Sequence, residues 1–321
     1  MTSRKIAFHI VVVLGALLGC AAVAGAQTQT PIYVSALGSN SNSGARNSPV
    51  RWIGQAISLV QAGGHVIIID SGDYDEIAIT KSVTIEAARG VTAVIPCLGN
   101  SSGIEVFGAQ NLTVVLRGLT IATCPGSAAN NGIVFSGGVP QTTLVVEDCV
   151  INGQFNTGIY SDVANLFVKD TSVMGCNSGM YVLYSYVSSA WNPCLATIEG
   201  CRLMGNNNGL TAAYNSHVAV HDTVASNNTG RGMQVLVLSG QVFAELDVEH
   251  CVASGNAVGI AGQGPGAGGG YALRVSNNFV SANQTGIYTN GQHTTYTLSN
   301  NTVMGNGTDI SVQFFYPVPP F

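Results

Sequence analysis

DVEHCVASGNAVGI, residues 247–260, contains the phrase on which most of the chain is built. A short apolar run leads into a turn of small and polar residues, and the phrase ends in a Gly followed by an aliphatic residue. A repeat of 21 to 30 residues with no helical pattern between its marks predicts an all-β solenoid, in which each repeat forms one coil of short strands. The eight Gly-aliphatic pairs are Gly103-Ile104, Gly132-Ile133, Gly158-Ile159, Gly179-Met180, Gly209-Leu210, Gly232-Met233, Gly259-Ile260 and Gly286-Ile287.

The strands before each turn align into columns of equivalent residues, which stacking places about 4.8 Å apart. One column holds residue types that tolerate positive φ, so it predicts a left-handed bend of one residue. Its members are Gly118, Asp148, Asp170, Gly200, Asp222, His250, Asn277 and Asn300. Because strand side chains alternate, the next column is predicted to face a dry interior, where its Asn residues must exchange amide hydrogen bonds. That column contains Leu119, Cys149, Thr171, Cys201, Thr223, Cys251, Asn278 and Asn301.

The column before the bend alternates in charge sign along most of its length, as in Arg117, Glu147, Lys169 and Glu199. We interpret it as a surface ladder rather than as acid/base machinery. In-register stacking would otherwise place like charges together, and each exposed pair contributes only ~0–1 kcal/mol.

Both ends of the chain depart from the repeat. Residues 50–62 have apolar residues at helical spacing and are predicted to form an amphipathic helix that caps the solenoid. Residues 27–49 are then a lead-in, residues 63–312 the solenoid, and residues 313–321 a C-terminal tail.

The first 26 residues have the pattern of an export signal. Arg4 and Lys5 precede an apolar run, and small residues at 24–26 mark a cleavage site. The pattern predicts a secreted or periplasmic protein without a transmembrane segment. The alternative is a lipid anchor at Cys20, which ends a sequence similar to a lipoprotein box.

The mature chain is mildly acidic. Without Arg4 and Lys5 it has 11 − 2 = 9 basic residues against 16 acidic ones, a net charge of −7. This balance, with no Lys/Arg run, argues against nucleic acid as a partner.

Seven cysteines follow the export signal. Cys149, Cys201 and Cys251 lie two coils apart in the interior column, roughly 9.6 Å by the strand spacing, and are predicted to be core thiols. In an exported protein the other four allow two disulfides, with free thiols as the alternative. The two pairs would be Cys97–Cys124 and Cys176–Cys194.

Several segments give the sequence a family resemblance. They are Ile32-Tyr33-Val34-Ser35, the helical stretch 52–61, the run 77–85 and Ser299-Asn300-Asn301-Thr302-Val303. Over residues 32–312 the chain resembles bacterial right-handed parallel β-helix repeat proteins of the pectate-lyase-like superfamily. The resemblance implies a single-stranded right-handed parallel β-helix. It implies no single activity, because the superfamily includes lyases, hydrolases, adhesins and scaffolds.

The first functional hypothesis is a non-catalytic scaffold that binds polysaccharide or a cell-surface glycan, with no cofactor or metal. It is based on an outward column that contains Glu105, Val134, Tyr160, Tyr181, Thr211, Gln234, Ala261 and Tyr288. Aromatic rings beside a carboxylate offer a sugar both apolar contact and hydroxyl partners. The predicted ligand-binding residues are Tyr160, Tyr181, Asp162, Tyr184 and Trp191.

The alternative hypothesis is a polysaccharide lyase or glycoside hydrolase that acts on acidic glycans. Such an enzyme needs a carboxylate pair and a base on one face. The best candidates are Asp162, Asp170 and Arg202, together with Lys169. Calcium would be required only under the lyase alternative. The segments typical of polygalacturonases are missing, since Asn156-Thr157-Gly158 stands where Asn-Thr-Asp is expected and no Gly-His-Gly occurs.

Overall fold

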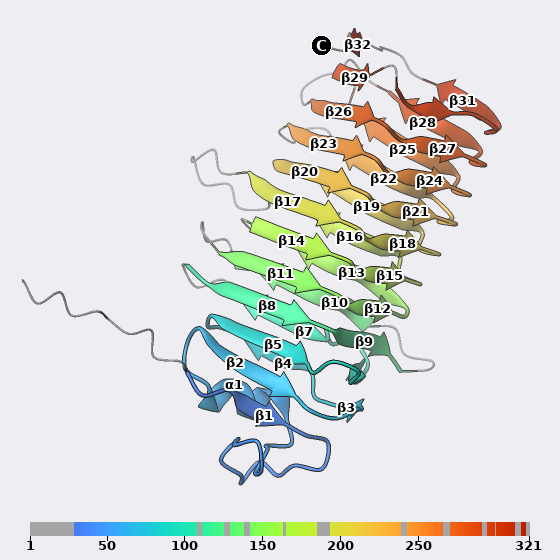
Figure 1. Cartoon of the computed structure of the whole chain (residues 1–321). Coiled ribbons are helices and arrows are strands. Elements are labelled where there is room, and N and C mark those ends of the chain that lie inside the picture. Colours follow the sequence, from blue (N-terminus) through green and yellow to red (C-terminus); the bar gives the residue numbers. More distant parts are fainter. Residues whose placement is uncertain are drawn as a thin grey trace, which may run out of the picture.

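Three parallel β-sheets form the sides of a solenoid whose coils stack along one axis (Figure 1). The predicted export signal and Cys20 lie outside the described residues, and no helix within those residues has the length and apolar character needed to cross a membrane. The computed structural model describes residues 29–107, 111–124, 129–137, 142–162, 165–184, 193–238, 243–265, 270–290, 294–298, 300–311 and 316–318.

Each coil contributes one strand to each sheet, so that neighbours within a sheet come from successive coils. The first sheet contains β1 (Ile32–Val34), β2 (Gly64–Ile68), β5 (Val83–Ala87), β8 (Thr113–Arg117), β11 (Thr143–Glu147), β14 (Asn165–Lys169), β17 (Cys194–Glu199), β20 (Ser216–His221), β23 (Ala244–Glu249), β26 (Tyr271–Ser276), β29 (Thr294–Leu298) and β32 (Tyr316–Val318). The second sheet contains β4 (Ile77–Ile79), β7 (Ile104–Phe107), β10 (Ala129–Ser136), β13 (Phe155–Ser161), β16 (Ser178–Val182), β19 (Asn208–Ala213), β22 (Arg231–Leu236), β25 (Val258–Gln263), β28 (Thr285–Thr289) and β31 (Thr308–Ser311). The third sheet contains β3 (Gly72–Asp73), β6 (Ala93–Cys97), β9 (Leu119–Thr123), β12 (Val150–Asn152), β15 (Ser172–Met174), β18 (Arg202–Met204), β21 (Val224–Ser226), β24 (Val252–Ser254), β27 (Phe279–Ser281) and β30 (Thr302–Val303).

The predicted bend separates the first sheet from the third. A single residue with positive φ departs from the extended conformation of the strands on either side. It therefore turns the chain from one sheet to the next, and no longer loop is needed. Seven members of the predicted column have φ between 48° and 68°, and they are Gly118, Asp148, Asp170, Gly200, Asp222, His250 and Asn277.

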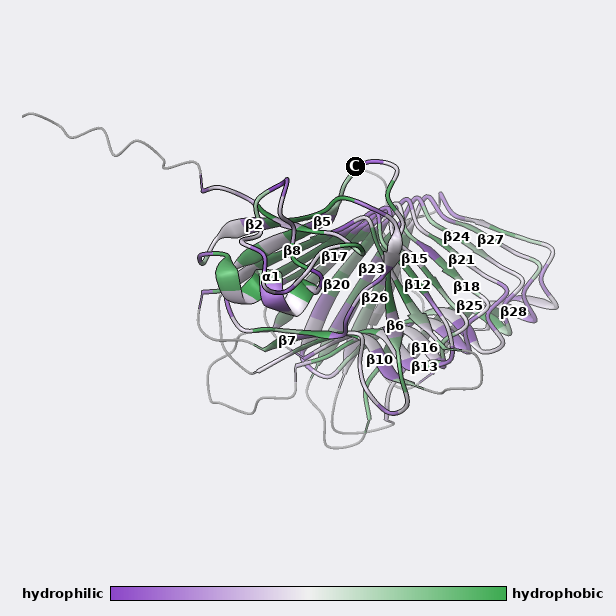
Figure 2. Cartoon of the chain, turned by 90° about the horizontal axis from the view of Figure 1, so that it is seen from below, coloured by the Kyte–Doolittle hydropathy of each residue, from purple (hydrophilic) through white to green (hydrophobic). Residues whose placement is uncertain are grey.

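The interior is apolar along the stack, since most of its buried residues are hydrophobic, and Figure 2 shows hydrophobic residues within the strands. Cys149, Cys201 and Cys251 are each 1% exposed, as the interior column predicts. Asn278 Nδ2 donates to Asn301 Oδ1 at 3.0 Å and to the Val248 carbonyl at 2.8 Å, which confirms the predicted exchange of amide hydrogen bonds.

A second internal ladder of asparagines runs along the corner between the third and second sheets. Each member from Asn228 to Asn283 donates through Nδ2 to a backbone carbonyl of the preceding coil and to the Oδ1 of the next asparagine. A buried amide that is fully satisfied in this way holds neighbouring coils in register. The inner ladder, as we name it, consists of Asn206, Asn228, Asn256, Asn283 and Asn306.

The alternating charged column pairs across coils at the surface. Arg117 Nε lies 2.5 Å from Glu147 Oε2, and Lys169 Nζ lies 3.1 Å from Glu199 Oε1. Strand register places these residues opposite one another, so the surface-ladder interpretation is confirmed.

At the N-terminal end, α1 (Ile53–Leu59) is shorter than the predicted 50–62 and packs against β1, β2 and β4. The Asp75 carboxylate accepts hydrogen bonds from the N–H groups of Ile53 and Gly54, which satisfies two free donors of the helix start. The first sheet begins ahead of this helix with β1 and continues past residue 312 with β32.

The two proposed disulfides are absent, since Cys97, Cys124 and Cys176 are free thiols. Cys176 follows β15, at the corner between the third and second sheets, whereas Cys194 begins β17 in the first sheet, so no bridge joins them. Cys97 and Cys124 do occupy neighbouring coils, where the Cys124 N–H donates to the Cys97 carbonyl at 3.3 Å. Burial raises the pKa of Cys97 to about 12, so its thiol stays protonated.

We expect iodoacetamide at pH 8 to leave Cys97, Cys149 and Cys251 unmodified in the folded protein. Burial excludes the reagent and raises the pKa of each thiol to about 12. Unfolding in urea without a reductant should then expose Cys97 and Cys124 to complete alkylation. Peptide mass spectrometry measures both states. A Cys97–Cys124 peptide pair that resists alkylation until a reductant is added would contradict the structure.

Candidate functional site

The outward column on the second sheet is aligned as the sequence predicts. Successive Cα pairings join Glu105, Val134, Tyr160, Tyr181, Thr211, Gln234, Ala261 and Tyr288. One continuous file of side chains therefore runs along the outer face of β7 to β28.

Tyr160 and Tyr181 form a stacked pair in this column, with ring centroids 6.3 Å apart and planes inclined by 13°. Both rings are half-buried. Burial raises the pKa of both phenols, and the negative charge of Asp162 raises that of Tyr160 further. Both hydroxyls are thus neutral at physiological pH and able to donate hydrogen bonds.

A groove of about 490 Å³ lies over this pair, and strands β10 to β22 provide its lining. Its floor follows the column through Tyr160, Tyr181, Thr211 and Gln234. Its remaining polar lining is made of asparagine, serine and threonine side chains. Among the described residues that line the groove, none is charged. Such a surface can stack on an apolar face and exchange several neutral hydrogen bonds, but it offers no ion pair.

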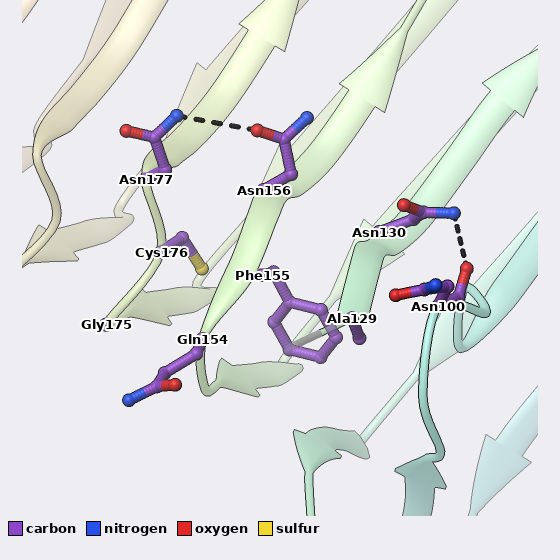
Figure 3. A pocket seen from close by; sticks show the side chains of 9 residues that line it. All are labelled: Asn100, Ala129, Asn130, Gln154, Phe155, Asn156, Gly175, Cys176 and Asn177. Atoms are coloured by element: carbon purple, nitrogen blue, oxygen red, sulfur yellow. Dashed lines mark hydrogen bonds between the residues drawn. The ribbon is translucent and has the colours of Figure 1, made fainter. Parts of the chain in front are cut away.

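A second hollow of about 450 Å³ adjoins the groove, and Figure 3 shows its residues. Asn156 and Asn177 line both hollows, and their amides point toward one another, with Asn177 Nδ2 3.4 Å from Asn156 Oδ1. Asn207 continues this outer ladder by donating to Asn177 Oδ1 at 3.1 Å. The outer ladder, defined by Asn156, Asn177 and Asn207, is exposed, unlike the inner ladder.

Sequence reasoning missed the outer ladder, although a signal for it was present. An asparagine stands two residues before the repeat Gly in four consecutive coils, at positions 130, 156, 177 and 207. Since the repeat sets the length and path of each coil, residues at a constant offset from the Gly must stack in one column, and two of these four, Asn156 and Asn177, line the groove.

The structure separates Asp162 from the other candidate catalytic residues. Asp162 directly follows β13, beside Tyr160, whereas Asp170 follows the far end of β14. A strand of five residues spans roughly 16 Å, so these two carboxylates do not share a site. Arg202 begins β18 opposite Ser172, so it lies on the coil next to Asp170, and Lys169 is paired with Glu199.

Tyr184, another predicted ligand-binding aromatic, lies elsewhere. Tyr184 is 4% exposed and does not line the groove, and Trp191 falls outside the described residues. In the described ranges, no group of three or more His, Cys, Asp or Glu side chains could hold a metal ion.

Comparisons with known proteins match the fold. A family model described as "Right handed beta helix region" matches residues 102–266. Among solved structures, the complex of XylC with xylose is similar with a TM-score of 0.61 and 10% identity, over 84% of this chain and 68% of that one. Pectate lyase Pel9A is similar with a TM-score of 0.58 and 16% identity, over 89% of this chain and 81% of that one. No match was found among curated proteins.

Proposed function

The chain belongs to the right-handed β-helix family, and from its groove we propose that it is a non-catalytic scaffold that binds polysaccharide. The fold alone does not decide the function, because lyases, hydrolases and binding proteins share it. The observation that carries the proposal is the stacked Tyr160–Tyr181 pair on the floor of an uncharged, hydrogen-bonding groove. Sugar rings have apolar faces and a rim of hydroxyls, and this lining complements both.

We expect Tyr160→Ala and Tyr181→Ala each to weaken glycan binding roughly tenfold, and the double variant to abolish retention on a polysaccharide array. Each substitution removes one face of the stacked pair while the solenoid core stays intact, since both rings point outward. Tyr288→Ala is the matched control, because Tyr288 belongs to the same column but lies outside the groove. Equal losses at Tyr288 and Tyr160 would contradict a site at the groove.

The same preparation tests the enzyme alternative. Asp162 lies the length of β14 away from Asp170, so the carboxylate pair that such an enzyme needs is not formed by these two groups, and the proposal assigns no catalytic role to Asp162, Asp170 or Arg202. Unsaturated products or new reducing ends released from uronate polymers would overturn the non-catalytic part of the proposal and leave the binding part standing.

The proposal includes an exported location through cleavage after Ala26, with a lipid at Cys20 as the alternative. It also includes a capping role for α1. Ile53, Ala56 and Ile57 of that helix are buried against the first coils, and a covered edge cannot pair with another sheet.

A further inference from the structure

Gln234 is an unusual residue on the groove floor. It is 3% exposed, and its Nε2 donates to Thr211 Oγ1 at 2.9 Å. Its Oε1 is buried and has no hydrogen-bond partner among the described residues. An unpaired buried acceptor is unfavourable by about 1–3 kcal/mol, so this amide is arranged for a partner that arrives with a ligand.

The charges around the groove restrict that ligand. Two carboxylates belong to its surroundings, since Glu105 lies in the floor column beside Val134 and Asp162 lies close enough to Tyr160 to raise its pKa. The cation nearest in register is Arg231, which begins β22 and does not line the groove. A polymer of uronic acids would bring one negative charge per sugar to a groove whose described lining contains no cation to neutralise it.

Building on the function proposed above, we propose that the groove binds a neutral glycan and that one hydroxyl of this glycan donates a hydrogen bond to Gln234 Oε1. A sugar hydroxyl can both donate and accept a hydrogen bond. It can therefore pair with the Gln234 side chain whether the oxygen or the nitrogen of the amide faces the groove. An ionised carboxylate only accepts hydrogen bonds, so the group that distinguishes a uronate sugar from a neutral one cannot serve as this donor.

The first experiment compares a neutral polymer with its uronic acid counterpart, which differ in a hydroxymethyl or carboxylate group on each sugar. Mannan is paired with polymannuronate, against the full mature chain. We expect the neutral member to bind, with an affinity that high salt leaves unchanged because no ion pair is involved. Preference for a uronate polymer overturns this inference and leaves the proposed function standing, whereas binding to no glycan overturns both.

The second experiment replaces Gln234 with Met, which has a similar volume and no hydrogen-bonding amide. We expect roughly tenfold weaker binding to the neutral polymer, with a melting temperature close to that of the wild type, because the substitution removes an unpaired buried acceptor as well as the hydrogen bond to Thr211. Gln263→Met is the matched control, since Gln263 lies opposite Leu236 on the neighbouring strand and outside the groove. Unchanged affinity in Gln234→Met, or an equal loss in Gln263→Met, would refute the role of Gln234.

Discussion

Replacing Asn256 with Leu is expected to lower the free energy of unfolding by about 3–5 kcal/mol, although Leu has nearly the same volume. Asn256 is 3% exposed, and its Oδ1 accepts hydrogen bonds from the backbone N–H of Asn228 at 3.0 Å and from Asn228 Nδ2 at 2.9 Å. Its Nδ2 donates to the Ala225 carbonyl and to Asn283 Oδ1, both at 3.0 Å. Leu would leave several of these buried groups without partners in the apolar interior.

Urea unfolding monitored by circular dichroism measures this loss. Asn207→Leu is the control, because Asn207 makes similar side-chain bonds in the outer ladder but is exposed, and water can replace its partners. We expect the control to lose less than about 1 kcal/mol. A comparable loss in both variants would mean that burial is not what makes the inner ladder stabilising.

The inner ladder also shows where sequence reasoning stopped short. The column of Asn278 and Asn301 was predictable, because a strand that alternates across a one-residue bend must place them inside. The asparagines of the inner ladder look like ordinary turn residues, since all but Asn283 follow a Gly or Asn, which are residue types suited to positive φ. The structure shows that Gly205, Asn227 and Gly255 do have positive φ, so that the next side chain points inward. A second bend per coil was therefore visible in the sequence, but the interior position of the following Asn depends on how the coil closes.

The groove was predictable only in part. Register alone places Tyr160 beside Tyr181 and Thr211 beside Gln234, and spacing from the repeat Gly was enough to find that column. Burial of Gln234 could not be predicted, since it depends on what covers an outward-facing residue rather than on the alternation within its strand. For the same reason the sequence suggested a Cys176–Cys194 bridge, because distance along a chain does not reveal at which corner of a coil each thiol lies.

Gly232→Ala is expected to lower the free energy of unfolding by about 3 kcal/mol, as an effect of space rather than of backbone freedom. A Cβ at Gly232 would lie 2.6 Å from the Gly259 carbonyl oxygen and 3.0 Å from Asn256 Nδ2. Neither neighbour can withdraw, because the carbonyl belongs to the next coil and the amide belongs to the inner ladder. A Cβ added at any repeat Gly would likewise lie within 3.0 Å of a carbonyl oxygen of the following coil, which explains why the Gly-aliphatic pair recurs in each coil.

The matched control separates this steric effect from the usual reason for a recurring Gly, which is a positive φ. Gly205 has a φ of 64°, and nothing lies within 4 Å of the position where a Cβ would be. Asn227, its equivalent on the next coil, adopts φ 55°, so Gly205→Asn should change stability by less than about 1 kcal/mol. Thermal and urea unfolding of both variants measure the contrast. If Gly232→Ala were as stable as Gly205→Asn, adjacent coils could move apart at the repeat Gly. The close stacking that aligns the tyrosine column and the groove would then not be enforced at that corner.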